Sequence, residues 1–164
     1  MPDTPLPRVA PSRERWSALY RDAFPRVYRA LVAALFDRDA ALDAIHDAFE
    51  EGLRRPPSDE RNVEGWLYRV ALRKARRSWR RSARNVTLAF APRAPDELAL
   101  TLDRVEIGRL LAMLSDRQRE IVVAHYYLGL RHEEIADILA IRPGTVAATI
   151  HQAIARMRKE TVRV

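Results

Sequence analysis

The sequence contains no cysteine, which excludes disulfide bonds and metal sites built from thiolates. It has no apolar run that approaches the ~18 residues of a membrane-spanning helix, and residues 1–13 lack the apolar core of a signal peptide. Clustered carboxylates or histidines are also missing, so we predict no metal, no cofactor and no catalytic site. We therefore expect a cytoplasmic protein that does not insert into membranes and is not an enzyme.

Acidic residues are absent between Arg73 and Arg84, in the second half of a helix that we predict over residues 62–84. Asn62 is a suitable N-cap for this helix. Helical spacing groups its apolar residues into a stripe on one face, which consists of Val63, Trp66, Leu67, Val70, Ala71 and Ala75. Arginines recur at helical spacing on one face, and further basic residues widen that stripe: Arg69, Arg73, Arg76 and Arg80, then Lys74, Arg77, Arg81 and Arg84. A solvated face normally mixes both signs of charge, whereas this one repels itself unless a polyanion covers it. With the net charge of +7, the stripe favours nucleic acid as a ligand.

The rest of the N-terminal half has the periodicity of a small helical bundle. Four prolines among the first eleven residues predict a disordered arm over 1–11. Ser12 can cap a first helix, and we expect Pro25 to break it or to begin a second one. A third helix is predicted to begin after residue 39 and to run to about residue 55, where two prolines stop it. Together with the basic helix, these segments form a predicted domain over 12–84.

The third helix has one apolar side and one acidic side. Helical spacing groups its apolar residues, which are Leu42, Ile45, Phe49 and Leu53. The opposite side carries polar and acidic residues, which are Asp43, His46, Asp47, Glu50 and Glu51. His46 beside Asp47 could suggest a metal site, but no third ligand accompanies them. The bundle therefore has one acidic and one basic side.

A change of composition separates two domains. Prolines and small residues over 85–96 predict a linker, and a second helical domain follows over 97–164. Ser115 and Gln118 form a capping box at the start of a helix in this domain. Gly129 is suited to the left-handed end of the same helix.

The end of the chain has the pattern of a helix-turn-helix. A short helix is predicted over 132–139, and after a brief turn a long helix begins at Pro143, a favoured residue for a first helical turn. The predicted fold is therefore all-α, with two small helical domains joined by a flexible linker and a helix-turn-helix in the second.

In this order, the segments resemble bacterial RNA polymerase sigma factors of the extracytoplasmic-function type (ECF, group 4 of the sigma-70 family). The N-terminal match comprises Leu19–Tyr20, Phe24–Tyr28, Asp43–Phe49 and Gly65–Ala71. The C-terminal match comprises Leu114–Ile121, Tyr126–Leu130, Glu134–Ala136 and Gly144–Val146. The resemblance implies a protein that binds core RNA polymerase, directs promoter recognition, melts the −10 element and so initiates transcription. Its expected partners are the β and β′ subunits and promoter DNA, and an anti-sigma factor is a further candidate.

The resemblance assigns roles to the N-terminal domain, which corresponds to sigma region 2. The acidic helix corresponds to the part that docks on the clamp helices of β′, through Asp43, His46, Asp47 and Phe49. The basic helix corresponds to the part that holds the melted −10 element, through Arg69, Arg73, Lys74, Arg76, Arg77, Trp79, Arg80 and Arg81. Arginines suit the phosphates of a single strand, and aromatic rings suit its unstacked bases. Relatives often have Asn where this chain has Arg73 and Asp where it has Arg77.

The C-terminal domain corresponds to sigma region 4, which recognises the −35 element. We expect contacts with the DNA from Arg131, Arg142, Thr145, Ala148, Thr149, His151, Gln152 and Arg156. Relatives commonly carry longer polar or basic side chains at the positions of Ala147 and Ala148, a glycine at Ala140 and a capping Ser or Thr at Arg131. These departures predict a −35 interaction dominated by phosphate contacts and DNA shape.

Two other functions could use parts of this sequence. A stand-alone helix-turn-helix regulator would bind duplex DNA as a dimer and without polymerase, but it gives the acidic and basic N-terminal helices no role. A small hydrolase or nuclease would need clustered carboxylates or histidines. The segment His132–Glu134 lacks the second histidine of the zinc-protease motif, so His125 and His132 are interpreted as non-catalytic.

Overall fold

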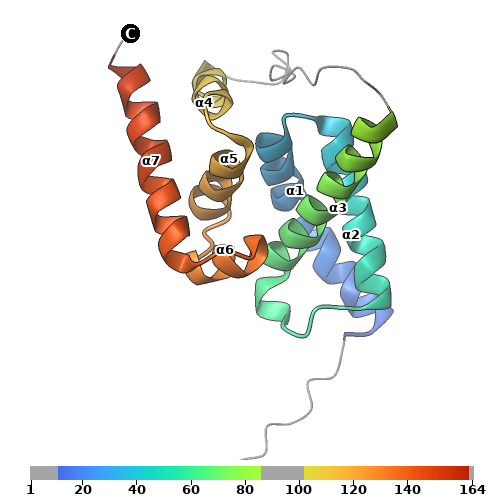
Figure 1. Cartoon of the computed structure of the whole chain (residues 1–164). Helices are drawn as coiled ribbons and strands as arrows, with labels where there is room; N and C mark the ends of the chain where they lie inside the picture. Colours follow the sequence, from blue (N-terminus) through green and yellow to red (C-terminus); the bar gives the residue numbers. More distant parts are fainter. Residues whose placement is uncertain (1–10, 86–101, 163–164) are drawn as a thin grey trace, which may run out of the picture.

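The computed structural model describes residues 11–85 and 102–162, with side chains for 11–81 and 105–162. Within those ranges all regular structure is helical, and two small domains lie side by side (Figure 1). The N-terminal domain consists of α1 (Arg13–Leu35), α2 (Arg38–Arg54), η1 (Glu60–Asn62) and α3 (Val63–Asn85). The C-terminal domain consists of α4 (Leu102–Ala112), α5 (Asp116–Val122), η3 (Val123–Tyr127), α6 (His132–Leu139) and α7 (Pro143–Thr161). The all-α, two-domain fold is confirmed.

Two predicted segments cannot be compared with this structure. Apart from Pro11 and Asn85, the predicted arm over 1–11 and the predicted linker over 85–96 lie outside the described residues.

The expected break at Pro25 is wrong, because α1 continues through it as one helix. Proline removes one backbone hydrogen bond and costs about 3 kcal/mol inside a helix. Pro25 is exposed, so water can reach the carbonyl that loses its partner. The buried positions continue at helical spacing from Trp16 through Ala23 and Val27 to Leu31. Burial on both sides of the proline therefore outweighs the local cost.

The predicted apolar stripe of α3 forms the centre of the N-terminal core. Its buried members are Val63, Leu67, Val70, Ala71 and Ala75, while Trp66 is half-buried and meets Trp16 edge to face. The N-cap prediction is also confirmed, since the Asn62 side-chain oxygen accepts a hydrogen bond from the Gly65 amide at 3.1 Å. On α2, the predicted apolar position Leu42 is instead 36% exposed and lies at the margin of the core.

Gly52 of α2 allows that helix to pass directly against Trp16. A Cβ at this position would lie 2.0 Å from the ring carbon Cζ2 of Trp16. The ring cannot easily retreat, because it is buried and its Nε1 donates a hydrogen bond to the Phe49 carbonyl at 3.1 Å. Close packing of α1 against α2 therefore requires glycine here.

We expect Gly52→Ala to lower the free energy of unfolding by about 1–3 kcal/mol through overpacking. Gly144→Ala is the matched control, because nothing lies within 4 Å of the added Cβ there. In that helix it should be neutral or stabilising by about 0.5–1 kcal/mol. Thermal unfolding of the two variants followed by circular dichroism measures both effects. Equal stability of the variants would contradict the proposed role of Gly52.

The C-terminal domain confirms most of the predicted boundary signals. Ser115 and Gln118 form the capping box, and Gly129 adopts a left-handed conformation with φ of 70°. The helix between them is not continuous α-helix, because the Leu128 amide bonds the Val123 carbonyl five residues earlier and forms the π-helical turn η3. Pro143 begins α7 as predicted.

The turn of the helix-turn-helix contains a strained residue. Ala140 has φ of 53°, in the left-handed region that disfavours any residue with a Cβ. Its amide closes the end of α6 on the Ala136 carbonyl. The turn therefore forms with alanine, although its Cβ disfavours this conformation.

Candidate nucleic-acid interface

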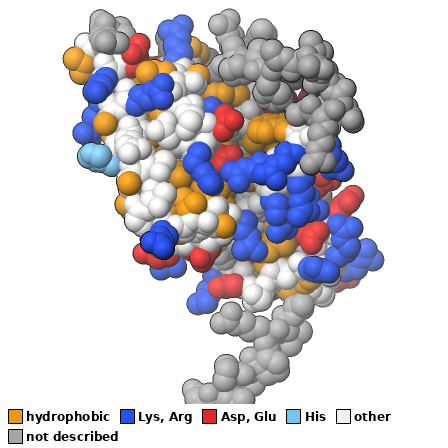
Figure 2. Space-filling model, in the orientation of Figure 1, with side chains coloured by type: hydrophobic (Ala, Val, Ile, Leu, Met, Phe, Trp, Pro, Cys, Tyr) orange, Lys and Arg blue, Asp and Glu red, His pale blue; other side chains and the backbone are white. Residues whose placement is uncertain are grey.

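The basic stripe of α3 forms an exposed surface on the N-terminal domain. Five of its arginines are exposed, which are Arg69, Arg73, Arg77, Arg80 and Arg81. Figure 2 shows Lys and Arg side chains gathered over this helix. Trp79 is half-buried and packs against the core, so its ring is only in part available to a base. The surface can bind phosphates along one helix face.

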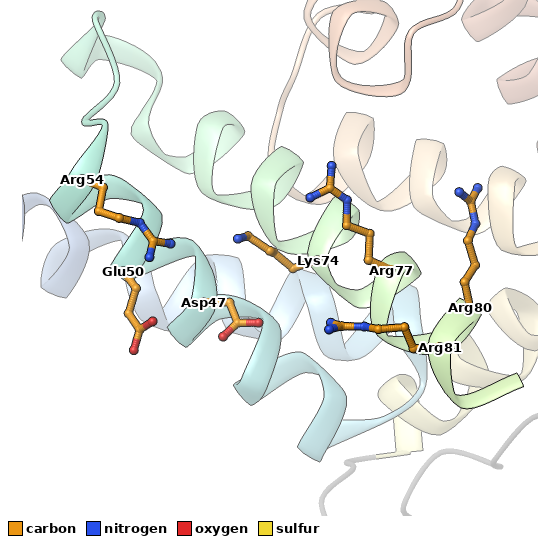
Figure 3. A pocket seen from close by; sticks show the side chains of 7 residues that line it. All are labelled: Asp47, Glu50, Arg54, Lys74, Arg77, Arg80 and Arg81. Carbon is orange, nitrogen blue, oxygen red and sulfur yellow. The ribbon is translucent and has the colours of Figure 1, made fainter. Parts of the chain in front are cut away.

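A cleft joins this basic surface to α2. It has a volume of about 530 Å³ and is lined by Asp47, Glu50, Arg54, Lys74, Arg77, Arg80 and Arg81 (Figure 3). Lys74 lies 3.4 Å from a carboxylate oxygen of Glu51, and this hydrogen bond is the main reason that the pKa of Glu51 is lowered. Glu51 is therefore an ion-pair partner of α3. The predicted docking surface and the predicted −10 surface adjoin along this cleft.

The predicted docking residues of α2 divide into two groups. Asp43, His46 and Asp47 are exposed and can meet a partner. Phe49 is half-buried, with its ring centroid 4.5 Å from that of Tyr20 and 6.3 Å from that of Trp16. Phe49 therefore packs in the core beneath the acidic surface and is not itself part of that surface.

Arg76 differs from the other arginines of α3, because it faces the C-terminal domain. It forms an ion pair with Glu120 of α5, and the side chain of Glu120 is only 4% exposed. Burial raises the pKa of Glu120, while the charge of Arg76 acts in the opposite direction. The predicted −10 contact of Arg76 and this ion pair use the same guanidinium.

A second cleft separates the basic stripe from α6. Its volume is about 550 Å³, and its walls are Arg69, Leu72, Arg73, Arg76, Arg77 and Arg80 of α3 with Asp137, Ile138, Leu139 and Ala140 of the helix-turn-helix. The structure therefore brings the two predicted DNA-binding elements onto opposite sides of one cleft.

The long helix of the helix-turn-helix presents a polar face to solvent. Most of the predicted −35 residues are exposed: Arg131, Arg142, Thr145, Ala148, His151, Gln152 and Arg156. Thr149 is half-buried, and its hydroxyl donates to the Thr145 carbonyl at 2.7 Å. Val146, Ile150, Ile154 and Met157 point into the domain, as helical spacing predicts. The backbone amide of Arg131 donates to the Glu134 carboxylate at 2.8 Å, while the Arg131 side chain remains 75% exposed.

Among the described residues, no group of three His, Asp or Glu side chains could hold a metal ion. No helix among those described is long and apolar enough to span a membrane.

Comparisons with known proteins cover both domains. A family model described as Sigma-70 region 2 matches residues 19–85, and one described as Sigma-70, region 4 matches residues 104–157. The RNA polymerase sigma-E factor of Streptomyces coelicolor is 30% identical over 91% of this chain and 85% of its own length. This chain belongs to the sigma-70 family. The ECF RNA polymerase sigma factor SigL of Mycobacterium tuberculosis is likewise 30% identical, over 86% of this chain and 85% of its own length.

Solved structures show the same fold. The sigma factor RpoE of Bartonella quintana was solved in complex with the anti-sigma factor NepR. It superposes on 88% of this chain over 94% of the RpoE chain, with a TM-score of 0.72 and 20% identity. CnrH, in complex with the cytosolic domain of CnrY, superposes on 93% of this chain over 90% of the CnrH chain, with a TM-score of 0.67 and 19% identity.

The chain is thus a sigma factor of the ECF type, which binds core RNA polymerase and directs promoter recognition and transcription initiation. The stand-alone regulator is not favoured, because the region 2 match spans the N-terminal helices that such a regulator would not need.

The residues through which this sigma factor joins its two domains were not predicted from the sequence. Tyr68 and Leu72 of α3 are each 1% exposed although they lie outside the predicted apolar stripe. Burial, and then the charge of Glu120, raises the pKa of Tyr68 well above its ordinary value. Their spacing of four residues was the available signal, since two large side chains one turn apart indicate a second packing face. Arg119 and Glu120 gave no such signal, because adjacent opposite charges are typical of helix surfaces.

Proposed function

We propose that the two domains of the sigma factor have separate roles, as their matches to sigma regions 2 and 4 suggest. Residues 12–84 dock on the β′ clamp through Asp43, His46 and Asp47, with Phe49 behind them, and hold the melted −10 strand on the basic face of α3. Residues 97–164 bind the −35 element through α6 and α7. The observation that supports this most directly is the exposed, wholly basic face of α3 beside the exposed acidic side of α2 (Figure 3).

The finer classification is also a proposal. We assign the chain to group 4, place it in the cytoplasm with its polymerase, and assign no catalytic step to the chain, because nucleotide addition belongs to core polymerase. An anti-sigma factor is a further proposed partner, supported by the two solved relatives, whose structures are titled as complexes of a sigma factor with NepR and of CnrH with CnrY.

Run-off transcription tests the division of work. Purified chain and core polymerase should produce transcripts from genomic promoter fragments, while either component alone should not. A duplex-binding protein that supports no transcription with core polymerase would overturn the proposal in favour of a stand-alone regulator.

Recognition of the −35 element should depend on phosphate contacts and shape. The free amides at the start of α7 and its positive dipole end can face a phosphate, and Pro143 favours that first turn. Helical spacing turns five of the predicted −35 residues towards the groove, which are Arg142, Thr145, Ala148, Thr149 and Gln152, and places His151 and Arg156 nearer its edges. Of the five, only Arg142 and Gln152 have long donor groups. We expect Arg142→Ala and Gln152→Ala each to weaken binding by about 1–3 kcal/mol, with modest discrimination per base pair.

A −35 substitution series at fixed salt measures this recognition. Ala155→Ser is a control, since this exposed residue lies further along α7. Base changes that each cost more than ~3 kcal/mol and are unaffected by either variant would show that another element reads the sequence.

A further inference from the structure

Glu51 of α2 binds two cations from different helices with a single carboxylate oxygen. Its Oε2 accepts from the Nζ of Lys74 on α3 at 3.4 Å and from a terminal guanidinium nitrogen of Arg54 on α2 at 3.3 Å. The side chains of Glu51 and Lys74 are 20% and 22% exposed, whereas that of Arg54 is 63% exposed. The carboxylate therefore fixes one cation from each wall of the cleft between α2 and α3.

The two cations converge on this oxygen. Figure 3 shows the charged ends of Arg54 and Lys74 turned towards one another across the cleft. Like charges that approach in this way repel each other unless an anion lies between them, and Glu51 is that anion. One carboxylate carries a single negative charge and cannot neutralise both cations. Positive charge therefore remains at this end of the cleft.

Both cations have more hydrogen-bond donors than the shared oxygen uses. An ammonium group has three N–H donors and a guanidinium group has five, and each group donates once to Glu51. A guanidinium can offer two parallel N–H groups to a phosphate, and an ammonium adds a compact positive charge. Arg54 and Lys74 together therefore have the chemistry of a phosphate site whose two cations are held in place by a carboxylate.

The other residues of the cleft favour an anion on its α3 side. Further arginines of α3 continue the line of positive charge from Lys74, while the carboxylates of Asp47 and Glu50 lie on α2. An anion is attracted by the first group and repelled by the second. Arg77 and Arg80 line this cleft and are also exposed on the basic face of α3. A strand held on that face therefore passes the opening of the cleft.

We propose that this end of the cleft binds a backbone phosphate of the promoter strand, with Arg54 of α2 as a DNA contact and Glu51 as the positioning residue that holds Arg54 and Lys74. The proposal rests on the proposed function, because it takes the basic face of α3 as the site of the −10 strand. It adds a DNA contact from α2, the helix whose acidic side is the proposed docking surface for polymerase. The two ligands of the N-terminal domain then meet at one helix.

A positioning role for Glu51 and a merely electrostatic one predict opposite effects of removing its charge. If Glu51 acts only as a nearby negative charge, its removal abolishes a repulsion and strengthens phosphate binding. If Glu51 positions the two cations, its removal weakens phosphate binding. Without it the two long side chains repel each other, and the phosphate itself must order them at an entropic cost. Glu51→Gln keeps the size of the side chain and distinguishes the two roles.

The phosphate site is tested with the chain bound to core polymerase and a fluorescent promoter fragment whose −10 region is mismatched and therefore already open. Fluorescence anisotropy at several salt concentrations gives the affinity and its salt slope. Arg54→Ala should weaken binding about fivefold and lower the slope of log affinity against log salt by about 0.7. Arg21→Ala, at an exposed position of α1, is the matched control and should change neither value appreciably. Unchanged affinity and slope in Arg54→Ala would overturn the phosphate site.

The same measurement tests the positioning role. Glu51→Gln should weaken binding about threefold, the cost of ordering one further long side chain, although the chain gains positive charge. Glu14→Gln makes the same change of charge at an exposed position of α1 and should not weaken binding. In a chain that already carries Arg54→Ala, Glu51→Gln should cost less, because one of its two partners is gone. Tighter binding by Glu51→Gln, or an undiminished cost in the double variant, would overturn the positioning role.

Core binding without DNA separates this site from folding and from docking. Arg54→Ala should bind core polymerase as the unsubstituted chain does, and a loss of core affinity would show that Arg54 meets the polymerase and not the promoter. Because the Arg54 side chain is largely exposed, this variant tests the site even if Glu51→Gln weakens the contact between α2 and α3.

The outcomes also separate this inference from the proposed function. Failure of run-off transcription by the unsubstituted chain would contradict the proposed function. Normal run-off transcription together with unchanged promoter affinity and salt slope in Arg54→Ala would overturn this inference alone.

Discussion

Replacing Arg73, Arg77 and Arg80 together by alanine is expected to lower open-complex formation on the order of a hundredfold, with core binding unchanged. All three are exposed on the basic face of α3. A hydrogen bond to a charged group contributes about 1.5–3 kcal/mol, and solvent exposure places these at or below the lower end. A total loss of about 3 kcal/mol corresponds to the stated factor. Arg76 is left in place, because its ion pair with Glu120 would add a second effect.

The salt dependence of open-complex formation shows whether lost phosphate contacts cause the defect of the triple variant. Each phosphate contact to a single strand contributes about 0.7 to the slope of log affinity against log salt, so the triple variant should lose about 2 from that slope. Permanganate footprinting at several salt concentrations measures it. Alanine at Arg13, Arg21 and Arg29 removes the same charge from exposed positions of α1 and should leave the slope nearly unchanged. Equal melting by both triple variants would show that the stripe is a solvated face.

Local signals in the sequence predict most helix boundaries, because the groups that fix a boundary lie within a few residues of it. Ser12 accepts from the Arg15 amide, and Ser115 and Gln118 exchange hydrogen bonds, as their spacing predicts. Periodicity likewise identifies the cores of both domains. Pro25 shows the limit of such signals, since the burial that keeps α1 continuous comes from other helices.

The domain contact could not be predicted from the sequence for the same reason. Arg119 bonds a carbonyl 85 positions earlier, and Glu120 pairs with a residue 44 positions earlier. In sequence the two residues look like an ordinary charged helix surface. Only the fold shows that α5 turns them towards α1 and α3, where they are buried. The predicted −10 residues could be identified as basic positions, and the structure leaves five of these arginines exposed but pairs Arg76 with Glu120.

Reversing the charges of Asp43 and Asp47 to lysine is expected to raise the dissociation constant for core polymerase on the order of a hundredfold or more. Both residues are exposed on α2, one turn apart, so the change leaves the buried side of the helix intact. Like charges placed against a basic docking surface cost several kcal/mol, and they slow association as well.

Binding to core polymerase without DNA is the measurement for this variant, because Asp47 lines the cleft shared with Lys74 and Arg81 and could also affect the promoter strand. Glu14→Lys with Asp22→Lys changes the net charge equally at exposed positions of α1 and should bind core polymerase almost normally. Unfolding curves of both double variants should stay within about 0.5 kcal/mol of the unsubstituted chain. Equal core affinity of the two double variants would show that attraction depends on total charge, and the acidic side of α2 would no longer qualify as the docking surface.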